Sequence, residues 1–512
     1  MPARRVDVVG GGPAGLYAAR LLKLNRPDWE VTVHERMRGS GDTFGFGVVL
    51  TGSTLDNLEN ADPISAADIR RVSHAGHALR LHRGTERIQL HGARNLAIGR
   101  NALLDVLDQH ARAAGVHVRS GEHIDTITLN ADIVIAADGV RSATREKLAA
   151  ELGADVHVGR GLYLWCGAPF ALTDSIFAPT HTEDGLFVAH AYPYTPDRST
   201  FLIETDEATW HHAGMDAMAT DTPTGDSDRT SLRYLEHAFA TELGGHALLG
   251  NRSRWSRFYT VHLDRWSHDN IVLIGDAAHT AHYTLGSGTK LALEDAIALS
   301  DNLLAESDIA TAFANYEQQR RPAVTRFQHL AARSQRWWES FPHRAHRPLP
   351  VLATGFMTRA GNLDLNRLAH NSPALVRAGL ETYSDTTISH LPADPTSWVL
   401  DQPWSHRTLT MPTRVITNPA TLGTVTHLAW SRPDPWTADA DAVLDTARAS
   451  TDEVVRLSGD QHPAGVQGRI DLAERIRLEL HRPVLVDLPN HTRAEAAAAL
   501  LCGRCDLVHF TD

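Results

Sequence analysis

The chain has 512 residues, 42% of them hydrophobic and 21% charged, which is the composition of an ordinary globular protein. It is too long for one hydrophobic core, and about two to four domains are expected. The 49 basic and 61 acidic residues give a formal net charge of −12 without any block of Lys or Arg, which argues against nucleic acid or an anionic membrane as a partner.

The cysteine content and the lack of long apolar runs point to the compartment. Cys166, Cys502 and Cys505 are too few for a disulfide framework and favour a reducing environment. The first residues lack the pattern of a secretion signal, and no apolar run approaches the roughly 20 residues that a membrane helix needs. The 30 histidines are dispersed. We therefore expect a cytoplasmic protein without a membrane span or a bound metal.

The first motif is a strand–turn–helix pattern near the N-terminus. A β-branched run is followed by Gly10, Gly12 and Gly15 in GxGxxG spacing and then by a helical pattern. This arrangement lays a dinucleotide pyrophosphate on a helix N-terminus. Gly10 makes the tight turn, Gly12 lets the backbone approach the phosphates, and Gly15 lets the helix pack on the strand. The alternative is a glycine-rich structural turn.

A second strand pattern ends at Glu35, about twenty residues beyond this turn, where a carboxylate accepts hydrogen bonds from a ribose 2′-OH. An acid here disfavours a 2′-phosphate, so the pocket suits FAD or NAD rather than NADP. Pro13 and Ala14 in the turn, and Arg36 beside Glu35, complete the candidate cofactor-binding residues of this region.

Two later motifs each place an acid at the end of an apolar strand. ADIVIAADGVRSATRE contains Asp138 and Gly139, and NIVLIGDAAHTA contains Gly275 and Asp276. Ligands of open α/β sheets lie at the carboxyl ends of the strands, so both acids are candidates for cofactor contact. A long, bent FAD has to be held a second time along its ribityl chain and pyrophosphate, which favours FAD over NAD.

GxGxxG, DG and GD in this order resemble the flavoprotein aromatic hydroxylases of the para-hydroxybenzoate hydroxylase type. By that resemblance Asp276 holds the ribityl hydroxyls, and Asp138-Gly139 lies near the pyrophosphate and the path of the nicotinamide donor. Arg100 matches the arginine that opens a helix beside the flavin; the alternative is a surface helix arginine. The implied fold is α/β, with a Rossmann-type FAD-binding domain interleaved with a mixed β-sheet substrate domain.

The segment after the GD motif is rich in glycine and polar residues but contains no nucleophile–base pair. In this class the flavin ring carries the chemistry, and the protein supplies orientation and electrostatics. We expect the backbone to approach the flavin along four consecutive residues, Gly286, Ser287, Gly288 and Thr289. The helix predicted from about residue 290 to 304 would point its N-terminal dipole at the reduced flavin.

Two side chains of the same segment, His282 and Tyr283, are candidate catalytic and substrate-pocket residues. Packing at a domain interface is the alternative. The alternating strands between residues 162 and 204, part of a sheet inserted at about 155–260, are expected to cover the pocket. Trp165, His190 and Tyr192 face it if the alternation places them on the inner side. Otherwise they belong to the core of that sheet or to its outer face.

A closer resemblance rests on GLFVAHAYPY, STFLIETDEATW and AHTAHYTLGSGTKLALEDAIAL, together with DTFGFGVVLTGSTLDNL and LAIGRNALLDVL. These stretches resemble the subfamily of salicylyl-CoA 5-hydroxylase and the monooxygenase half of 2-aminobenzoyl-CoA monooxygenase/reductase, from residue 1 to about 385. The resemblance implies that NADH or NADPH reduces the FAD and that O2 reacts as a flavin C4a-hydroperoxide. The implied substrate is an aromatic acid held as a CoA or acyl-carrier-protein thioester. A homodimer is common in this type.

From about residue 400 the composition shifts, and the pieces at both ends of the tail resemble the start and end of an old-yellow-enzyme-type barrel. Only 512 − 400 = 112 residues remain, whereas a complete (β/α)8 barrel takes roughly 250. We predict domains 1–395 and 396–512, the second a degenerate, non-catalytic barrel remnant without a second flavin. Cys502 and Cys505 form a lone CxxC, for which two incidental thiols are favoured over a zinc or redox role.

The leading prediction is an FAD- and NAD(P)H-dependent monooxygenase of an anthraniloyl- or salicyloyl-type thioester. Two alternatives stay open. The first is a flavin hydroxylase of a free aromatic or indolic substrate. The second is a catalytically silent FAD-binding scaffold whose tail is a docking surface.

Overall fold

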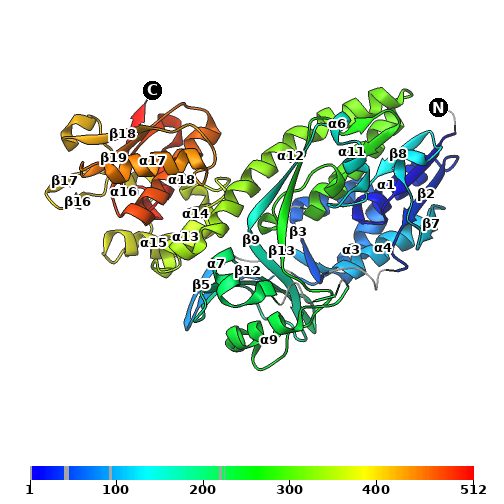
Figure 1. Ribbon diagram of the computed structural model, residues 1–512, viewed down its shortest axis with the longest axis horizontal. Coiled ribbons are helices and arrows are strands. Elements are labelled where there is room, and N and C mark those ends of the chain that lie inside the picture. The colour runs from blue at the N-terminus through cyan, green and yellow to red at the C-terminus, as the bar shows by residue number, and fades with distance from the viewer. Residues whose placement is uncertain are drawn as a thin grey trace. The chain divides into compact units, whose positions relative to one another are not determined.

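The computed structural model describes residues 3–39, 45–75, 77–91, 95–217, 222–223, 225–286 and 288–511. The chain forms two compact units, residues 1–79 with 93–335 and residues 80–92 with 336–512 (Figure 1). The division falls inside one long helix, α12 (Ile309–Glu339). The division therefore reflects how tightly the residues pack together. The predicted domain boundary between residues 395 and 396 stays a prediction.

The first unit contains a six-stranded sheet in the order β14-β15-β8-β1-β2-β7, in which β14 alone is antiparallel. The strands are β1 (Arg5–Val9), β2 (Glu30–Glu35), β7 (His117–Ser120), β8 (Ile133–Ala136), β14 (Ser267–His268) and β15 (Ile271–Leu273). The chain leaves β1 for β2 on one side and later adds β8 on the other. The strand order therefore reverses between β1 and β8, and open α/β sheets bind their ligands at such a point.

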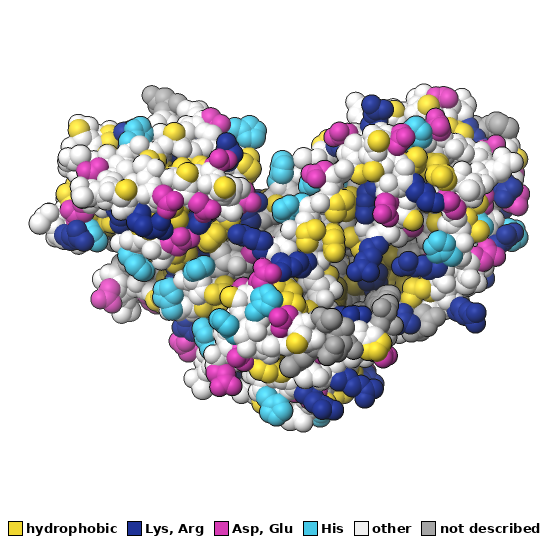
Figure 2. All heavy atoms as spheres, viewed as in Figure 1, with side chains coloured by type: hydrophobic (Ala, Val, Ile, Leu, Met, Phe, Trp, Pro, Cys, Tyr) yellow, Lys and Arg dark blue, Asp and Glu magenta, His cyan; other side chains and the backbone are white. Residues whose placement is uncertain are grey.

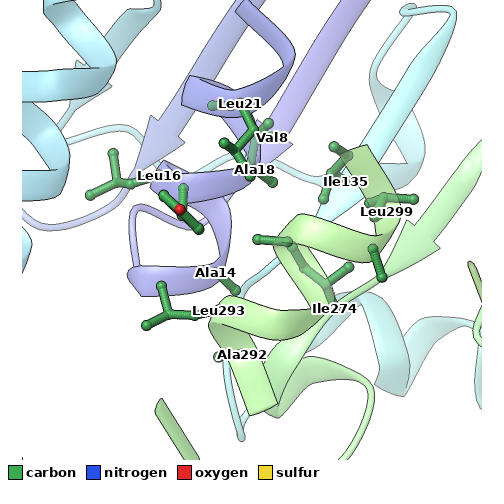
Figure 3. Close-up of a cluster of buried hydrophobic side chains, with 14 of the residues drawn as sticks. Val8, Ala14, Leu16, Ala18, Leu21, Ile135, Ile274, Ala292, Leu293 and Leu299 are labelled. Carbon is green, nitrogen blue, oxygen red and sulfur yellow. The ribbon is translucent and has the colours of Figure 1, made fainter. Parts of the chain in front are cut away.

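Helix α1 (Pro13–Asn25) packs against this sheet through an apolar face. Figure 3 shows Leu16 and Leu21 of α1 clustered with Val8 of β1 and Ile135 of β8, together with Leu299 of helix α11 (Gly288–Ala305). All five side chains are almost completely buried. Burying a side chain of this size stabilises a fold by ~1.5–3 kcal/mol, so this cluster holds the first turn of α1 against the strand ends.

The first unit also contains several helices and a pair of short strands outside its larger sheets. They are β3 (Gly47–Leu50), α2 (Gly52–Ala61), α3 (Pro63–Val72), β6 (Leu96–Gly99), α4 (Arg100–Ala113), α5 (Ala143–Lys147), α6 (Ala149–Leu152), α7 (Glu207–His212), α9 (Arg229–Ala238) and α10 (Ala240–Leu243). Strands β3 and β6 pair antiparallel. Helix α4 begins at Arg100, whose backbone N–H donates to the carbonyl of Phe46 at 2.7 Å.

The second sheet of this unit is antiparallel, with its strands in the order β13-β9-β12-β11-β10. They are β9 (Ala154–Ala168), β10 (Ser175–His181), β11 (Leu186–Thr195), β12 (Arg198–Thr205) and β13 (Ser256–Leu263). One face is apolar and packs under α9, as shown by the buried Phe187, Phe201 and Ile203 against Leu235 and Phe239. Because side chains alternate along a strand, the opposite face carries a separate set of residues.

The second unit contains a four-stranded parallel sheet in the order β18-β19-β20-β21, which is also the order along the chain. Its elements are β18 (Val425–Ala429), α17 (Ala438–Ala449), β19 (Val454–Ser458), α18 (Pro463–Leu480), β20 (Val484–Pro489), α19 (Arg493–Leu501) and β21 (Leu507–Thr511), and α17 and α18 lie beside the sheet (Figure 1). A consecutive parallel series with intervening helices is the repeat from which (β/α)8 barrels are built.

Two hairpins and four helices complete the second unit. They are β4 (Leu79–Arg83) with β5 (Glu86–His91), β16 (Trp404–His406) with β17 (Leu409–Met411), α13 (Leu349–Thr358), α14 (Leu365–Asn371), α15 (Pro373–Ser384) and α16 (Pro395–Leu400). Glu474 of α18 joins the tail to the residues before it. Its carboxylate lies 3.2 Å from Arg344 Nε and 2.7 Å from Arg347 NH1.

Acidic and basic side chains are interspersed on the face shown in Figure 2, as expected from a composition without a basic block. Among the described residues, none of the helices is both long and apolar enough for a membrane span. The three cysteines are buried free thiols. Burial raises the pKa of the Cys505 thiol to about 12 and also raises the pKa of Cys502. Thiols that stay protonated are poor nucleophiles and poor metal ligands.

Candidate active site

Three glycine-containing turns, two of which also contain an aspartate, lie next to each other in the first unit. They follow β1, β8 and β15, which are adjacent parallel strands. A Cβ atom on Gly10 would come within 2.2 Å of the carbonyl oxygen of Ala137, and one on Gly275 within 3.2 Å of the Ala14 Cβ. The GxGxxG, DG and GD motifs, far apart in the sequence, thus converge at one edge of the sheet.

The three glycines of the first turn occupy different environments. Gly10 has φ +108°, and Gly15 is so close to the strand that a Cβ would lie 2.1 Å from the carbonyl oxygen of Gly10. Gly12 precedes α1, and a Cβ there would meet no other atom within 4 Å. Gly10 and Gly15 are therefore required by the fold itself, whereas the side of Gly12 is open. Pro13 opens the helix, where its missing N–H costs nothing.

Glu35 closes the same turn from the end of β2. One carboxylate oxygen accepts the Gly11 N–H at 2.6 Å and the other accepts the Met37 N–H at 2.7 Å. These contacts fix the carboxylate beside the turn, and each oxygen retains a lone pair for a ribose hydroxyl. The neighbouring Arg36 is exposed.

The DG turn presents one oxygen that has no hydrogen-bond donor. Asp138 Oδ2 accepts the backbone N–H of Thr144 at 3.1 Å and its hydroxyl at 3.0 Å. Asp138 Oδ1 is buried and has no hydrogen-bond partner among the described residues. Gly139 has φ +82°, and a Cβ there would meet nothing within 4 Å. A buried, unpaired carboxylate oxygen is costly unless a ligand supplies the donor.

Arg145 of α5 ties the DG turn to the GD turn. Its guanidinium donates to the carbonyl of Ala277 at 3.0 Å and to the carbonyl of Val140 at 2.5 Å. Arg145 is itself 7% exposed. A planar guanidinium with several donors suits such bridging of backbone carbonyls, so the two turns keep a fixed separation.

Asp276 is exposed to solvent and has a perturbed carboxyl group. Its side chain is exposed to solvent, yet it is surrounded closely enough that burial raises the pKa of its carboxyl, against the opposing charges of Arg100 and His279. The two observations agree if the carboxylate is on the wall of a concave site that water enters. The charge of Arg100 acts on Asp276, so the start of α4 belongs to the same region.

These residues fit FAD. The open space beside Gly12 and Gly139 can take a pyrophosphate, and the unpaired Asp138 Oδ1 and the accessible Asp276 can accept hydrogen bonds from cofactor hydroxyls. Among the described residues, no three or more His, Cys, Asp or Glu side chains form a group that could hold a metal.

The segment after the GD turn leads into α11. Gly286 has φ +63°, and a Cβ on Gly286 or Gly288 would meet nothing within 4 Å. Helix α11 begins at Gly288, followed by the half-buried Thr289, close to the predicted start at about residue 290. The predicted contact at Ser287 lies outside the described residues. An open backbone at a helix N-terminus is suited to a flat, anionic group.

His282 and Tyr283 form part of an aromatic cluster. The ring of His282 lies 4.8 Å from that of Phe258, edge to face, and Tyr283 lies 5.0 Å from Tyr163 in the same manner. His282 Nδ1 is 3.0 Å from the hydroxyl of Thr284. Both predicted residues are thus held by packing, and both contact the antiparallel sheet.

Trp165, His190 and Tyr192 all lie on the face of that sheet opposite to its apolar core. The register pairs His190 with Leu202, and Leu202 with Trp165, so these side chains form one row across three strands. Tyr192 lies in the next row, and its hydroxyl donates to the carbonyl of Gly47 at 2.7 Å. The indole N–H of Trp165 is buried without a hydrogen-bond partner among the described residues.

Glu204, which was not among the predicted residues, joins the sheet to the loop after the GD turn. It accepts from the Tyr283 hydroxyl and lies 2.9 Å from His190 Nε2. Burial alone would raise the pKa of this carboxyl, but His190 and His282 and the hydrogen bonds hold it below its ordinary value. A buried carboxylate that stays ionised can accept and hold a proton-donating partner.

The signals for Glu204 and Arg145 are weak in the sequence. Alternation along the strand places Glu204 on the same face as Leu202. It places Glu204 on the same face as His190, which lies on the adjacent strand, only when the strand register is known. Arg145 is one of several cations after the DG motif, and its inward direction depends on the short helix α5.

Residues 4–331 match the family described as FAD binding domain. The chain belongs to this FAD-binding family. It is a flavin-dependent aromatic monooxygenase with FAD as its cofactor, which confirms the predicted resemblance.

Two relatives align with this chain over different lengths. The chain is 35% identical to the salicyloyl-CoA 5-hydroxylase of a Streptomyces species, over 99% of this chain and 100% of that protein. It is 40% identical to the 3-hydroxy-4-methyl-anthranilyl-[aryl-carrier protein] 5-monooxygenase of Streptosporangium sibiricum, over 71% of this chain and 97% of that protein. The first alignment includes the tail, so the expectation that the resemblance ends near residue 385 is wrong for this relative.

The fold has counterparts among solved structures. The tetrameric form of 2-methyl-3-hydroxypyridine-5-carboxylic acid oxygenase aligns with a TM-score of 0.52 at 22% identity, covering 77% of this chain and 100% of that chain. At this identity the likeness concerns the fold, which agrees with the predicted α/β architecture of an FAD-binding unit with an interleaved sheet.

Proposed function

We propose that this chain is an FAD- and NAD(P)H-dependent monooxygenase that hydroxylates an aromatic acid of the anthraniloyl or salicyloyl type, held as a CoA or carrier-protein thioester, with O2 as the oxygen source. The observation that carries the proposal is the similarity along 99% of the chain to a salicyloyl-CoA 5-hydroxylase. The site geometry supports it, because three cofactor turns adjoin an aromatic sheet face.

FAD, when bound, supplies the redox chemistry by taking electrons from NADH or NADPH and activating O2. The turn from Gly10 to Gly15 would bind its pyrophosphate, Glu35 its ribose, and Asp276 its ribityl hydroxyls. Asp138 Oδ1 would gain the donor that it lacks. Arg100, whose charge acts on Asp276, would balance negative charge along the cofactor.

The sheet face would hold the aromatic ring and exclude water. Trp165 offers an indole N–H without a hydrogen-bond partner among the described residues, which suits a carbonyl oxygen such as that of a thioester. His190 and Tyr192 are both fixed by hydrogen bonds and would orient the ring without moving. Fixed contacts of this kind keep a substrate in reach of the reactive centre.

Tyr283 and Glu204 would act on the ring substituent. The Tyr283 hydroxyl donates to the ionised Glu204, and the lone pairs of its oxygen can accept a hydrogen bond from a ring hydroxyl or amine. Such a contact draws electron density into the ring, which favours attack by an electrophilic oxygen. The carboxylate can take up the proton, and His190 lies 2.9 Å from it on the other side.

The tail is proposed to be half of a (β/α)8 barrel of the old-yellow-enzyme type that has lost its catalysis. The four consecutive parallel strands support this origin. A half barrel lacks half of the loops that form a barrel's active site, so we expect one flavin per chain. We further propose a cytoplasmic homodimer, to be checked by sedimentation.

The test is a steady-state assay with anthraniloyl-CoA, salicyloyl-CoA and the free acids. Consumption of NADH or NADPH should accelerate with a thioester, and the product should be heavier by one oxygen atom. A rate indifferent to every thioester, in protein that binds FAD, would favour the silent scaffold. Hydroxylation of the free acids alone would favour the second enzymatic alternative.

A further inference from the structure

A completely buried carboxylate lies behind the GD turn. Asp295 of α11 is 0% exposed. Its Oδ2 accepts the backbone N–H of Gly275 at 3.0 Å and lies 2.7 Å from His279 Nε2, and its Oδ1 accepts from Arg320 Nε at 2.9 Å. Three segments of the first unit therefore meet at one side chain that the sequence analysis did not single out.

Burying a carboxylate among apolar neighbours costs free energy, so packing alone does not explain an acid at this position. Its neighbours Leu291 and Ala296 on α11 are buried in the main core, where an apolar residue would pack without any charge to compensate. Burial would raise the pKa of Asp295, but His279 and Arg320 hold it below its ordinary value. The carboxylate therefore stays ionised, and its three partners all lie outside its own helix.

Two of those partners flank Asp276 in the sequence. Gly275 immediately precedes it, in a left-handed conformation with φ +58°, and His279 follows three residues later. The Gly275 N–H that Asp295 accepts sets the direction in which the chain leaves β15. His279 is 3% exposed and packs on Trp266 with ring centroids 4.9 Å apart, so it lies behind the turn.

We propose that Asp295 is a positioning residue for FAD. By holding Gly275 and His279 it fixes the backbone on both sides of Asp276, so that the exposed Asp276 carboxylate keeps a single orientation. The inference rests on the proposed function in one respect, the contact between Asp276 and the ribityl chain. Arg320 completes the arrangement by balancing the charge of Asp295 from α12.

The test compares two ligands on the full-length apoprotein. FAD would reach all three turns, whereas ADP lacks the ribityl chain and would not reach Asp276. Asp295→Asn removes the charge but keeps the size of the side chain. We expect the Kd for FAD, measured by flavin fluorescence, to rise about tenfold or more. The Kd for ADP, measured by calorimetry, should change less than about threefold.

Glu294→Gln is the matched control. Glu294 precedes Asp295 on the same helix and lies 3.1 Å from Arg320 NH1, and its other polar partners are Lys290 and Asn57, which lie outside the GD turn. The control should bind both ligands like wild type. If Asp295→Asn is insoluble, His279→Asn, which removes one of the two contacts, is judged by the same ratio of FAD to ADP affinity.

Each outcome decides. Loss of FAD affinity with retained ADP affinity supports the positioning role. Equal loss of both, or the same loss in Glu294→Gln, would mean that Asp295 only stabilises the fold. Unchanged FAD affinity overturns the inference directly. If the wild-type chain itself bound no FAD, the cofactor assignment would fail instead.

Discussion

The carboxylate of Glu204 on β12 lies 2.9 Å from the imidazole Nε2 of His190 on the adjacent strand β11. The same carboxylate accepts from the hydroxyl of Tyr283, which belongs to the loop between the GD turn and α11. One buried acid thus joins the face of the antiparallel sheet to the segment that is proposed to lie along the flavin. This arrangement gives the first prediction.

Tyr283→Phe should lower the rate of hydroxylation by about tenfold to a hundredfold, because it removes the group between the ring substituent and Glu204. FAD affinity should change little, since Tyr283 is proposed to contact the substrate. The measurement is the amount of product formed per NAD(P)H consumed, together with the amount of hydrogen peroxide released. Tyr234→Phe is the control, because the Tyr234 hydroxyl bonds to Thr182 and Asp184, away from this face. Equal effects of the two variants would remove Tyr283 from the mechanism.

The pH dependence of stability follows from the lowered pKa of Glu204. A carboxyl whose pKa is lower in the folded chain than the ordinary 4.5 adds stability above about pH 4.5, and that stability is lost as the pH falls through the folded value. The difference in unfolding free energy between wild type and Glu204→Gln should therefore shrink as the pH falls below about 4.5. Denaturant unfolding at several pH values measures it. A difference that grows on acidification would contradict the ionised, paired carboxylate.

Gly12 and Gly15 should respond differently to the same substitution. Gly12→Ala adds a methyl group to open space, so the apoprotein should unfold within about 2 °C of wild type. The methyl group would occupy the path of the pyrophosphate, and the Kd for FAD should rise at least about tenfold. Gly15→Ala would force a methyl group to 2.1 Å from a carbonyl oxygen and should destabilise the apoprotein itself. Calorimetry without FAD separates the two. If the Gly12→Ala apoprotein melted as far below wild type as the Gly15→Ala apoprotein, both glycines of the turn would be purely structural.

Glu474 should be essential to the second unit. It is almost fully buried, and Arg344, Arg347 and Arg504 hold the pKa of its carboxyl at about 2 although burial raises it. Glu474→Gln would leave buried guanidinium groups uncompensated and should cost about 3–5 kcal/mol of stability. Glu479 pairs with Arg475 on the same helix, where both side chains are half-buried, and Glu479→Gln should cost less than about 1 kcal/mol. Similar denaturation midpoints for both variants would contradict the role of Glu474.

Local motifs were more predictable than long-range pairings. The glycine and aspartate turns could be predicted because their spacing constrains the backbone within a few residues, and the structure brings the three turns together. The row containing Trp165 and His190 could be predicted only conditionally, since a shift of one residue in register reverses the face. The contact between Glu204 and Tyr283 depends on the packing of a sheet against a distant loop. No local pattern encodes it.

Long-range pairings in the tail were likewise not predictable from the sequence. The tail's resemblance to barrel strands indicated the parallel α/β topology, but two partners of Glu474, Arg344 and Arg347, lie more than a hundred residues earlier. A chain that ended near residue 400 would deprive both guanidinium groups of this carboxylate. Domain limits chosen from composition alone therefore need not coincide with the compact units.

We propose that the FAD held by these three turns, and no side chain, delivers an oxygen atom from O2 to the aromatic ring of a thioester. Turnover of salicyloyl-CoA and anthraniloyl-CoA with NADH or NADPH under isotopically labelled O2, followed by mass spectrometry of the thioester, is the decisive measurement. We expect one labelled oxygen atom in the product of the wild-type chain and almost none from Gly12→Ala. Oxygen derived from water, or undiminished labelling in a Gly12→Ala protein free of FAD, would contradict it.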